Sequence, residues 1–405
     1  MRYLLSILAV FAVLSIGNQA RADEVPGVTD DEILVGMTTD LTGPIAFIGQ
    51  QVTGGARLYL QHVNENGGVH GRKINLRVED DGYQPPRTVA AFRKLLGRDR
   101  VFCFAGNLGS ATTMATLPLV ERERVPLVMP GNFNSRMTTP PRRHVFALDP
   151  NYLVQSWIIA QYIAETDKTE SPRLAVVYQD DDMGHDGLKG LREAAAHYGL
   201  PIVAEESYKR GAVDFGTQVL NMKSADPTQV ILLTVYRSGA AIMKEAQQAG
   251  WKPQFIGWLP NADGKTVELA GEAAEGFIGL AIVDLQSEEE PMQLYRDLLA
   301  RHTPDTRAGI YHTLGFGVAQ TLVEGLRRAG RDLTREKLVD ALETLDRWDG
   351  SVLPPITYGP GLRGGAFTAA FMAKADVENK SMVRSSGWLR FESRTVQVAQ
   401  HDSSN

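Results

Sequence analysis

The sequence has very little cysteine, and this scarcity excludes several kinds of protein. Cys103 is the only cysteine among 405 residues, so an intramolecular disulfide and a metal site built on paired cysteines are both excluded. Cys103 lies in an apolar run at 101–105 with no histidine close to it in sequence. That setting favours a buried small hydrophobic side chain over a reactive thiol.

The sequence also lacks the motifs of the common catalytic and metal sites. It contains no G-x-S-x-G, no P-loop and no H-E-x-x-H, and the stretch from Gly36 to Gly43 after the first predicted strand holds no G-x-G-x-x-G. The acidic segment 180–186 lacks the spaced Asp/Asn pattern and final Glu of a calcium loop, and a solvated loop that caps the next helix is favoured there. We therefore expect no enzyme, no bound metal and no cofactor.

Only one long hydrophobic run is present, and it lies at the start of the chain. Residues 4–16 are apolar, follow Arg2 and precede Ala20-Arg21-Ala22, an A-x-A cleavage pattern. A membrane anchor is the alternative, but spanning a bilayer needs roughly 20 apolar residues. We expect a secretory signal, residues 1–22, that is cleaved after Ala22 and directs the protein out of the cytoplasm.

Basic residues are also fewer than acidic ones. The chain has 42 Lys and Arg against 48 Asp and Glu, a formal charge of −6, and loss of Arg2 and Arg21 with the signal would make it −8. Scattered basic residues without a basic tract argue against nucleic acid or an anionic membrane surface as a partner. The length suggests two domains.

Strand and helix patterns alternate along most of the chain. The first series has strands at 33–38, 73–79, 101–105 and 125–129 and helices at 54–66, 88–96 and 111–122. The second has helices at 154–165, 187–198, 214–224 and 240–250 and strands at 173–178, 202–207, 229–235, 255–258 and 276–283. The tail has helices at 295–302, 311–328 and 334–345, the last capped by Thr334, and strands at 356–358 and 367–374. We expect an α/β fold of two Rossmann-like lobes with parallel sheets, joined by multiple hinge crossovers.

Several loops that follow predicted strands could line a small-molecule site. They are residues 40–50, 106–110 and 130–133, and the pair 179–186 with 236–239. Any one of them could be an ordinary strand-to-helix turn, so the prediction rests on loops of two lobes converging. Ligands of open α/β sheets bind at this edge, and helix starts favour anions there. Ser110 and Thr112 add hydroxyl groups.

Aromatic residues lie beside these loops. Phe47, Phe133, Tyr236 and Trp258 each follow a predicted strand end. Each could be simple core or hinge packing. Together they predict an aromatic-walled pocket in which Ser110 and nearby N–H groups hold a polar or anionic head group.

These segments also carry a family resemblance. They are TGPIAFIGQ, NENGGVHGRKINL, EDDGYQPPRT, GNLGSATTMA, VPLVMPG, VVYQDDDMGHDGL, MKEAQQAGWKPQFIGW and GVAQTLVEGLRRAG. In order and spacing the chain resembles the periplasmic solute-binding proteins of the branched-chain amino acid (Leu/Ile/Val-binding) type, which serve ATP-binding-cassette (ABC) importers. The resemblance covers essentially the whole mature chain.

The resemblance implies an architecture and a partner. It implies the type I periplasmic binding protein fold, with one lobe of residues 23–148 plus about 283–352 and another of 149–282 plus about 353–405. It implies a periplasmic monomer that binds a small-molecule ligand and docks on an ABC permease in the inner membrane.

The resemblance also implies ligand-binding residues in the first lobe. Ser110 matches the serine that binds the ligand carboxylate, and Gly131 and Phe133 match the loop that contacts the same head group. Ile48 stands where an aromatic side chain often touches the ligand, with Phe47 beside it.

In the second lobe the resemblance implies both matches and a departure. Met183 stands at a position that is commonly tyrosine, and Tyr236 matches a ligand-facing tyrosine. Amino-acid binders of this type place a Glu near Leu259, beside Trp258, to pair with the α-ammonium group. Asp263 is the nearest acid and is out of register.

The missing Glu bears on the ligand. A buried ammonium group without a carboxylate partner is heavily penalised. We therefore expect an importer subunit that binds an aromatic or aliphatic carboxylate without an α-amino group. The alternatives are a branched-chain or other amino acid as ligand, and a sensor that reports ligand occupancy to a signalling partner.

Overall fold

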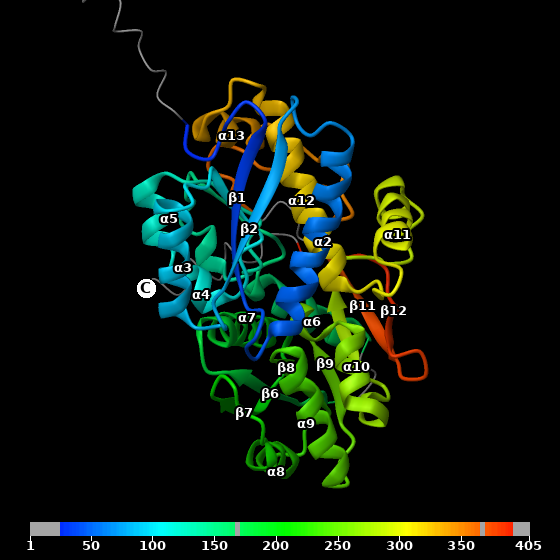
Figure 1. The fold of residues 1–405 in the computed structure, drawn as a ribbon. Coiled ribbons are helices and arrows are strands. Elements are labelled where there is room, and N and C mark those ends of the chain that lie inside the picture. Colours follow the sequence, from blue (N-terminus) through cyan, green and yellow to red (C-terminus); the bar gives the residue numbers. More distant parts are fainter. Residues whose placement is uncertain (1–24, 167–170, 365–368, 392–405) are drawn as a thin grey trace, which may run out of the picture.

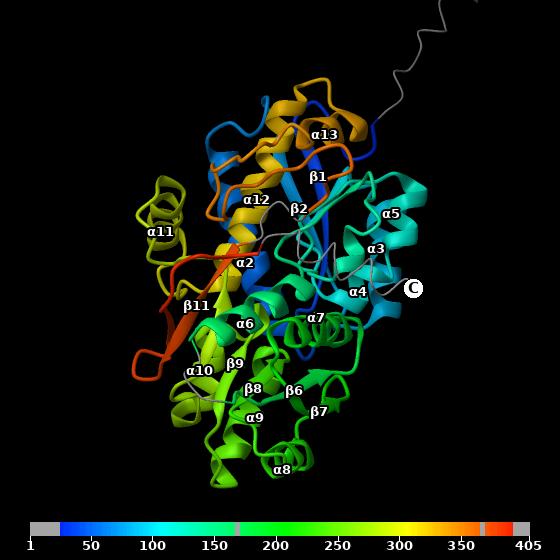
Figure 2. The ribbon, with the colours of Figure 1, turned by 180° about the vertical axis from the view of Figure 1, so that it is seen from behind.

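The computed structural model describes residues 25–166, 171–364 and 369–391. The predicted signal, residues 1–22, lies outside the described residues. Figures 1 and 2 show two α/β lobes, one built mainly from the first third of the chain and the other mainly from its middle. None of the helices in the described ranges has the length and apolar character needed to cross a bilayer.

The first lobe contains a five-stranded, fully parallel sheet in the order β2-β1-β3-β4-β5. Its strands are β1 (Glu32–Thr39), β2 (Lys73–Asp80), β3 (Cys103–Ala105), β4 (Leu127–Val128) and β5 (Val145–Phe146). The helices of this lobe are α2 (Ala46–Glu65), α3 (Pro85–Gly97), α4 (Ser110–Met114), α5 (Leu117–Glu123), α11 (Glu290–His302), α12 (Ile310–Ala329) and α13 (Arg335–Leu342), with a 3₁₀ turn at Ser135–Met137. Figure 1 shows α2 and α12 side by side on one flank of the sheet and α3, α4 and α5 on the other.

The second lobe contains a larger, mixed sheet in the order β12-β11-β10-β9-β8-β6-β7, with β13 also paired to β11. Its strands are β6 (Leu174–Gln179), β7 (Ile202–Tyr208), β8 (Gln229–Leu233), β9 (Gln254–Gly257), β10 (Ile278–Ala281), β11 (Ala369–Asp376), β12 (Ser381–Arg384) and β13 (Leu389–Arg390). Its helices are α6 (Tyr152–Thr166), α7 (Asp182–Tyr198), α8 (Gly216–Ser224), α9 (Tyr236–Gln248) and α10 (Gly264–Ala270), with 3₁₀ turns at Leu259–Asn261 and Gly271–Ala274. Strands β11, β12 and β13 run antiparallel to their neighbours.

The chain passes between the lobes at three places. It leaves the first sheet between β5 and α6, returns between β10 and α11, and crosses again between α13 and β11. The expected α/β class, with two lobes, mainly parallel sheets and several crossovers, is confirmed. The residue boundaries given above for the lobes stay a prediction.

Burial explains why these segments fold as they do. All five residues of β8 are buried, as expected for a central strand with helices over both faces. Helix α12 buries most of its length between the first sheet and α2. Cys103 is fully buried in β3, and burial raises the pKa of its thiol to about 12, as a structural role requires.

Four helices begin at least four residues earlier than the sequence predicts. The predicted starts at residues 54, 187, 240 and 295 are wrong; the helices begin at Ala46, Asp182, Tyr236 and Glu290. In two of these helices, glycines permit close packing. A Cβ on Gly55 would lie 1.8 Å from the carbonyl oxygen of His312 in α12, and one on Gly184 would lie 2.0 Å from that of Gln179.

Two other predicted elements differ from the structure. The single helix expected at 111–122 is split into α4 and α5. In one continuous helix the Pro118 ring would clash with the Met114 carbonyl, and Pro118 has no N–H to donate to it. The strand expected at 356–358 is reduced to one isolated bridge between Trp348 and Ile356. The predicted Thr334 cap is confirmed, since its hydroxyl accepts a hydrogen bond from the Lys337 N–H.

Candidate functional site

Two aromatic side chains meet across the lobes at the first predicted loop. Phe47 lies in the first turn of α2, and Tyr236 is the first residue of α9 in the other lobe. Their ring centroids are 5.5 Å apart, and Tyr311 from α12 meets the edge of Phe47 at 6.3 Å. The earlier start of both helices therefore brings these rings together from helix N-termini and not from loops.

A second aromatic group joins the lobes deeper in the molecule. Phe133, which follows β4, lies 5.8 Å from Tyr152, and Tyr152 lies 4.5 Å from Trp258, which follows β9. The Trp258 indole is fully buried and donates to the carbonyl of Thr234 at 2.7 Å. A Cβ at Gly187 would fall 2.4 Å from the indole ring, so that glycine makes room for it.

Ser110 lies beside this second group. It is the first residue of α4 and follows Gly109, whose φ of 98° favours glycine. The Ser110 hydroxyl is buried and donates to the Tyr152 hydroxyl at 3.2 Å. The Thr112 hydroxyl instead donates to the Leu108 carbonyl at 2.8 Å, so it fixes the turn.

Gly131 is part of the framework that holds Ser110. Its N–H donates to the Asn107 carbonyl at 2.7 Å, and its carbonyl accepts from the Gly109 N–H at 3.1 Å. These two bonds form a parallel bridge between the loops that follow β3 and β4. The Gly131 backbone therefore positions the serine loop.

The other two predicted residues are buried apolar side chains. Ile48 lies in the first turn of α2, and Met183 lies in the first turn of α7. Both belong to the large apolar cluster that also contains Phe133, Tyr236 and Trp258. That cluster draws its residues from both lobes.

The acidic residues around this region are bonded to backbone N–H groups. Asp263, which caps α10, accepts from the N–H of Lys265 at 2.8 Å and, across the lobes, from that of Ile310 at 3.1 Å. Burial raises the pKa of this carboxyl. The Asp40 carboxylate accepts hydrogen bonds from three N–H groups of its own turn. The carboxylates of Asp263 and Asp40 are thus both bonded to the backbone, and the Leu259 side chain carries no charge.

The acidic loop before α7 also serves the fold. Asp181 accepts from the N–H groups of Met183 and Gly184, so the predicted capping role is confirmed. Within the described ranges, no group of three or more His, Cys, Asp or Glu side chains is placed to hold a metal ion.

One set of polar contacts joins α7 to the 3₁₀ turn of the first lobe. The Asp186 carboxylate accepts from the Ser135 N–H at 2.8 Å and from its hydroxyl at 2.5 Å. Asn134 donates to the Asp182 carbonyl at 2.7 Å, and Arg136 pairs with the Asp182 carboxylate at 3.1 Å. Burial raises the pKa of Asp186.

A second set is centred on Tyr83, just beyond β2. The Arg210 guanidinium lies 4.6 Å from the centre of the Tyr83 ring and donates to the Tyr83 carbonyl at 3.1 Å. Arg210 also pairs with Asp181 at 2.9 Å, and Gln179 donates to the Tyr83 hydroxyl at 3.3 Å. These two sets of polar contacts join the two lobes directly.

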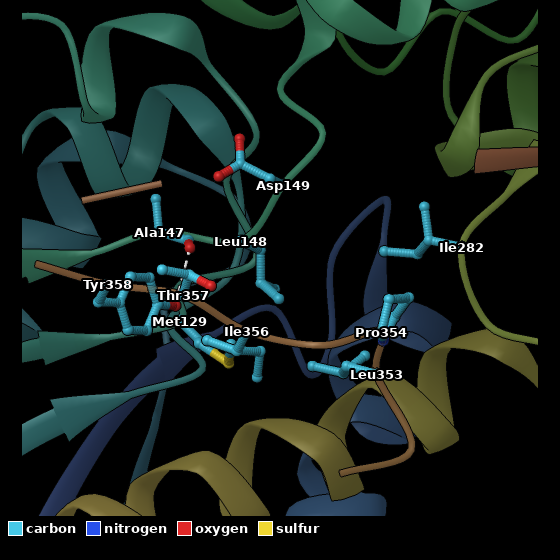
Figure 3. A pocket seen from close by; sticks show the side chains of 10 residues that line it. All are labelled: Met129, Ala147, Leu148, Asp149, Ile282, Leu353, Pro354, Ile356, Thr357 and Tyr358. Carbon is cyan, nitrogen blue, oxygen red and sulfur yellow. Dashed lines mark hydrogen bonds between the residues drawn. The ribbon is translucent and has the colours of Figure 1, made fainter. Parts of the chain in front are cut away.

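Cavities lie along the boundary between the lobes. Figure 3 shows one of about 30 Å³ at the crossovers, where the Tyr358 hydroxyl donates to the Ala147 carbonyl at 2.9 Å. A cavity of about 310 Å³ borders Phe47 and Asp263, and one of about 530 Å³ borders Tyr83 and Val235. These two larger cavities fall in the size range of small-ligand pockets.

Sequence reasoning missed several residues of this region. Tyr152 begins a helix directly after a crossover, and nothing in the local pattern distinguishes it from a core residue. Tyr83 lies in a segment that entered the sequence argument only through resemblance. Ser135 and Asp186 are 51 positions apart, so only the folded chain reveals that they pair.

Comparisons with known proteins agree with this architecture. The profile of the periplasmic binding protein family matches residues 32–380. The leucine-, isoleucine-, valine-, threonine- and alanine-binding protein of Pseudomonas aeruginosa is 23% identical over 334 residues, which are 82% of this chain and 87% of that protein.

Two solved structures show the same likeness in three dimensions. A fatty acid ABC transporter substrate-binding protein from Thermomonospora curvata has a TM-score of 0.82 at 25% identity, covering 92% of this chain and 95% of that one. A branched-chain amino acid ABC transporter structure from Thermus thermophilus with bound valine has a TM-score of 0.82 at 20% identity, covering 92% and 100%. The fold shared with these structures spans almost the whole chain.

Proposed function

Since the chain belongs to the periplasmic binding protein family of ABC transporters, we propose that it is an importer's substrate-binding subunit for an aromatic or aliphatic carboxylate that lacks an α-amino group. The relatives are binding proteins and not enzymes, and the family implies a periplasmic location. In this proposal the two lobes close around the ligand and the closed form docks on a permease.

One observation carries the choice of ligand, namely the lack of a carboxylate for an ammonium group. Leu259 and Trp258 occupy the segment where amino-acid binders present a Glu, and Leu259 is buried. Asp263, the nearest acid, is bonded to the N–H groups of Lys265 and Ile310. At the Leu259 position an α-ammonium group would therefore have no counter-charge, and leaving a buried charge unpaired costs several kcal/mol in proteins.

The apolar and aromatic surroundings support the same choice. Ile48, Phe133 and Met183 bring hydrophobic surface to the boundary of the lobes, and Ser110 brings a buried hydroxyl. The likeness to a fatty acid transporter's binding protein is in line with an acid that has an apolar tail.

The alternative ligand is a branched-chain or other amino acid. It is favoured by the printed names of several relatives, which describe leucine-, isoleucine- and valine-binding proteins. The two readings differ in a single chemical group, so a pair of matched ligands separates them.

Isothermal titration calorimetry on protein unfolded and refolded free of ligand provides the test. 4-Methylpentanoate is leucine without its amino group, and 3-phenylpropanoate bears the same relation to phenylalanine. We expect at least one acid of these pairs to bind roughly 100-fold more tightly than its amino acid, the ratio that about 2.7 kcal/mol produces. Tighter binding of leucine than of 4-methylpentanoate, with no binding of 3-phenylpropanoate, would overturn the proposal.

A further inference from the structure

Tyr152 occupies the inner end of the region where the lobes meet. It is the first residue of α6, directly after the crossover from the first lobe, and its N–H donates to the Phe133 carbonyl at 2.7 Å. Its ring is 3% exposed and packs between Phe133 and Trp258. Both lobes therefore hold the ring in place.

The Tyr152 hydroxyl retains a proton that it can donate. It accepts from the Ser110 hydroxyl at 3.2 Å, and in the described part of the chain this is the one hydrogen bond that the structure gives it. A phenol is both a donor and an acceptor, and buried polar hydrogens normally have acceptors. Burial raises the pKa of the phenol, so it stays protonated at neutral pH.

A ligand carboxylate would supply the acceptor that this hydroxyl lacks. A carboxylate has two oxygens and only accepts hydrogen bonds, and two hydroxyl groups 3.2 Å apart can both donate to it. The Tyr83 ring lies close to Gly109, since a Cβ on that glycine would fall 2.8 Å from the ring. The rings of Tyr83 and Tyr152 therefore both lie beside the turn that carries Ser110.

We propose that Tyr152 binds the ligand and determines its specificity. Its hydroxyl donates a hydrogen bond to the ligand carboxylate beside Ser110. Its ring, packed 4.5 Å from Trp258, makes the wall next to that carboxylate apolar and so favours an α-carbon without an ammonium group. This inference rests on the proposed function, since it describes how the head group of that ligand is held.

The test uses Tyr152→Phe, which keeps the ring and removes only the hydroxyl. Tyr295→Phe is the matched control, since Tyr295 is equally buried and its hydroxyl bonds the His312 ring at 3.0 Å in the first lobe. Both variants and the wild type are titrated with 4-methylpentanoate, leucine and the neutral analogue 4-methylpentanamide. 3-Phenylpropanoate, phenylalanine and 3-phenylpropanamide form the second set.

We expect Tyr152→Phe to weaken binding of the preferred acid at least 10-fold and binding of its amide much less, because a hydrogen bond to a charged group is the stronger one. Tyr295→Phe should stay within about 3-fold of the wild type. Equal losses for acid and amide, or no loss, would overturn the role of Tyr152.

Failure of the inference and failure of the proposed function give different results. Should the wild type prefer leucine, the proposed function fails, and Tyr152 is then judged on leucine and its amide by the same comparison. Should the wild type prefer an acid that Tyr152→Phe binds equally well, the proposed function stands and the inference is wrong. A wild type that binds no member of either set overturns both.

Discussion

The Asp186 carboxylate in one lobe accepts two hydrogen bonds from Ser135 in the other, at 2.8 Å from the backbone nitrogen and 2.5 Å from the hydroxyl. Ser135 lies close in sequence to Phe133, and the pair joins the same two lobes as the aromatic contacts. Asp186 is 9% exposed, so these bonds form away from bulk water. They stabilise the closed arrangement and have no counterpart once the lobes separate.

Ser135→Ala should therefore weaken ligand binding by loosening closure. A hydrogen bond to a charged, buried group contributes about 1.5–3 kcal/mol, so we expect an increase in Kd of roughly 10-fold. Calorimetry with the bound acid measures it, and small-angle scattering of the ligand-bound variant should show a larger radius of gyration. Ser224→Ala, which removes an exposed hydroxyl of α8, is the control. An unchanged Kd would contradict a role for the Ser135 hydroxyl in closure.

Arg210→Ala should lower the free energy of unfolding by about 1–3 kcal/mol. The substitution leaves the largely buried Asp181 carboxylate without its ion-pair partner and removes the cation that lies over the Tyr83 ring. Chemical denaturation in urea measures the change. Lys209→Ala is the neighbouring control. Its side chain is 86% exposed where it pairs with Asp180, so its loss should change stability far less than the loss of Arg210. Equal effects of the two variants would refute this account.

The alternating pattern was sufficient to predict the two α/β lobes because buried parallel strands leave a strong sequence signal. The continuous apolar strand β8 and the amphipathic helix α13 with its Thr334 cap are examples. The starts of α2 and α7 were predicted too late. The sequence shows that a Cβ is missing at Gly55 and Gly184, but only packing shows whether a turn or a neighbouring backbone is the reason.

Some residues of the candidate site could be predicted from the sequence, and others could not. Phe47, Tyr236 and Trp258 could be singled out because each stands near a predicted strand end. The structure places Phe47 and Tyr236 in a contact between the lobes and packs Trp258 against Tyr152. Tyr152 could not be found, since its importance depends on where the crossover delivers it. Nor could the bond from Ile310 to Asp263, which spans 47 positions, be read from the chain.

The paired glycines of α2 test the packing explanation directly. Gly55→Ala puts a methyl group 1.8 Å from a backbone oxygen of α12, so we expect a loss of about 2–3 kcal/mol in the free energy of unfolding. Gly54→Ala meets only the His312 side chain at 3.2 Å and gains helix propensity of up to ~1 kcal/mol. Thermal denaturation measures the stability of both variants. A Gly55→Ala variant as stable as Gly54→Ala would contradict the explanation that Gly55 is required for close packing against α12.

Asp81 predicts a pH dependence of stability. Its carboxyl is fully buried, which raises its pKa from 3.8 to about 6, although the Tyr83 N–H and the Thr88 hydroxyl bond it and partly offset the shift. The folded state then binds more protons than the unfolded state between pH 4 and pH 6. Stability should therefore fall as pH rises through that window, by about 3 kcal/mol, and level off above it.

Asp81→Asn keeps an acceptor for the Tyr83 N–H, can donate to the Thr88 hydroxyl and does not titrate, so it should remove that fall. The free energy of unfolding of the variant minus that of the wild type should increase by about 3 kcal/mol between pH 4 and pH 7. Urea denaturation at several pH values measures this difference. Asp30→Asn makes the same charge change at a side chain that is 94% exposed and is the control for the loss of one negative charge. A difference between Asp81→Asn and the wild type that does not change with pH would contradict the predicted cost of burying the ionised Asp81 carboxylate.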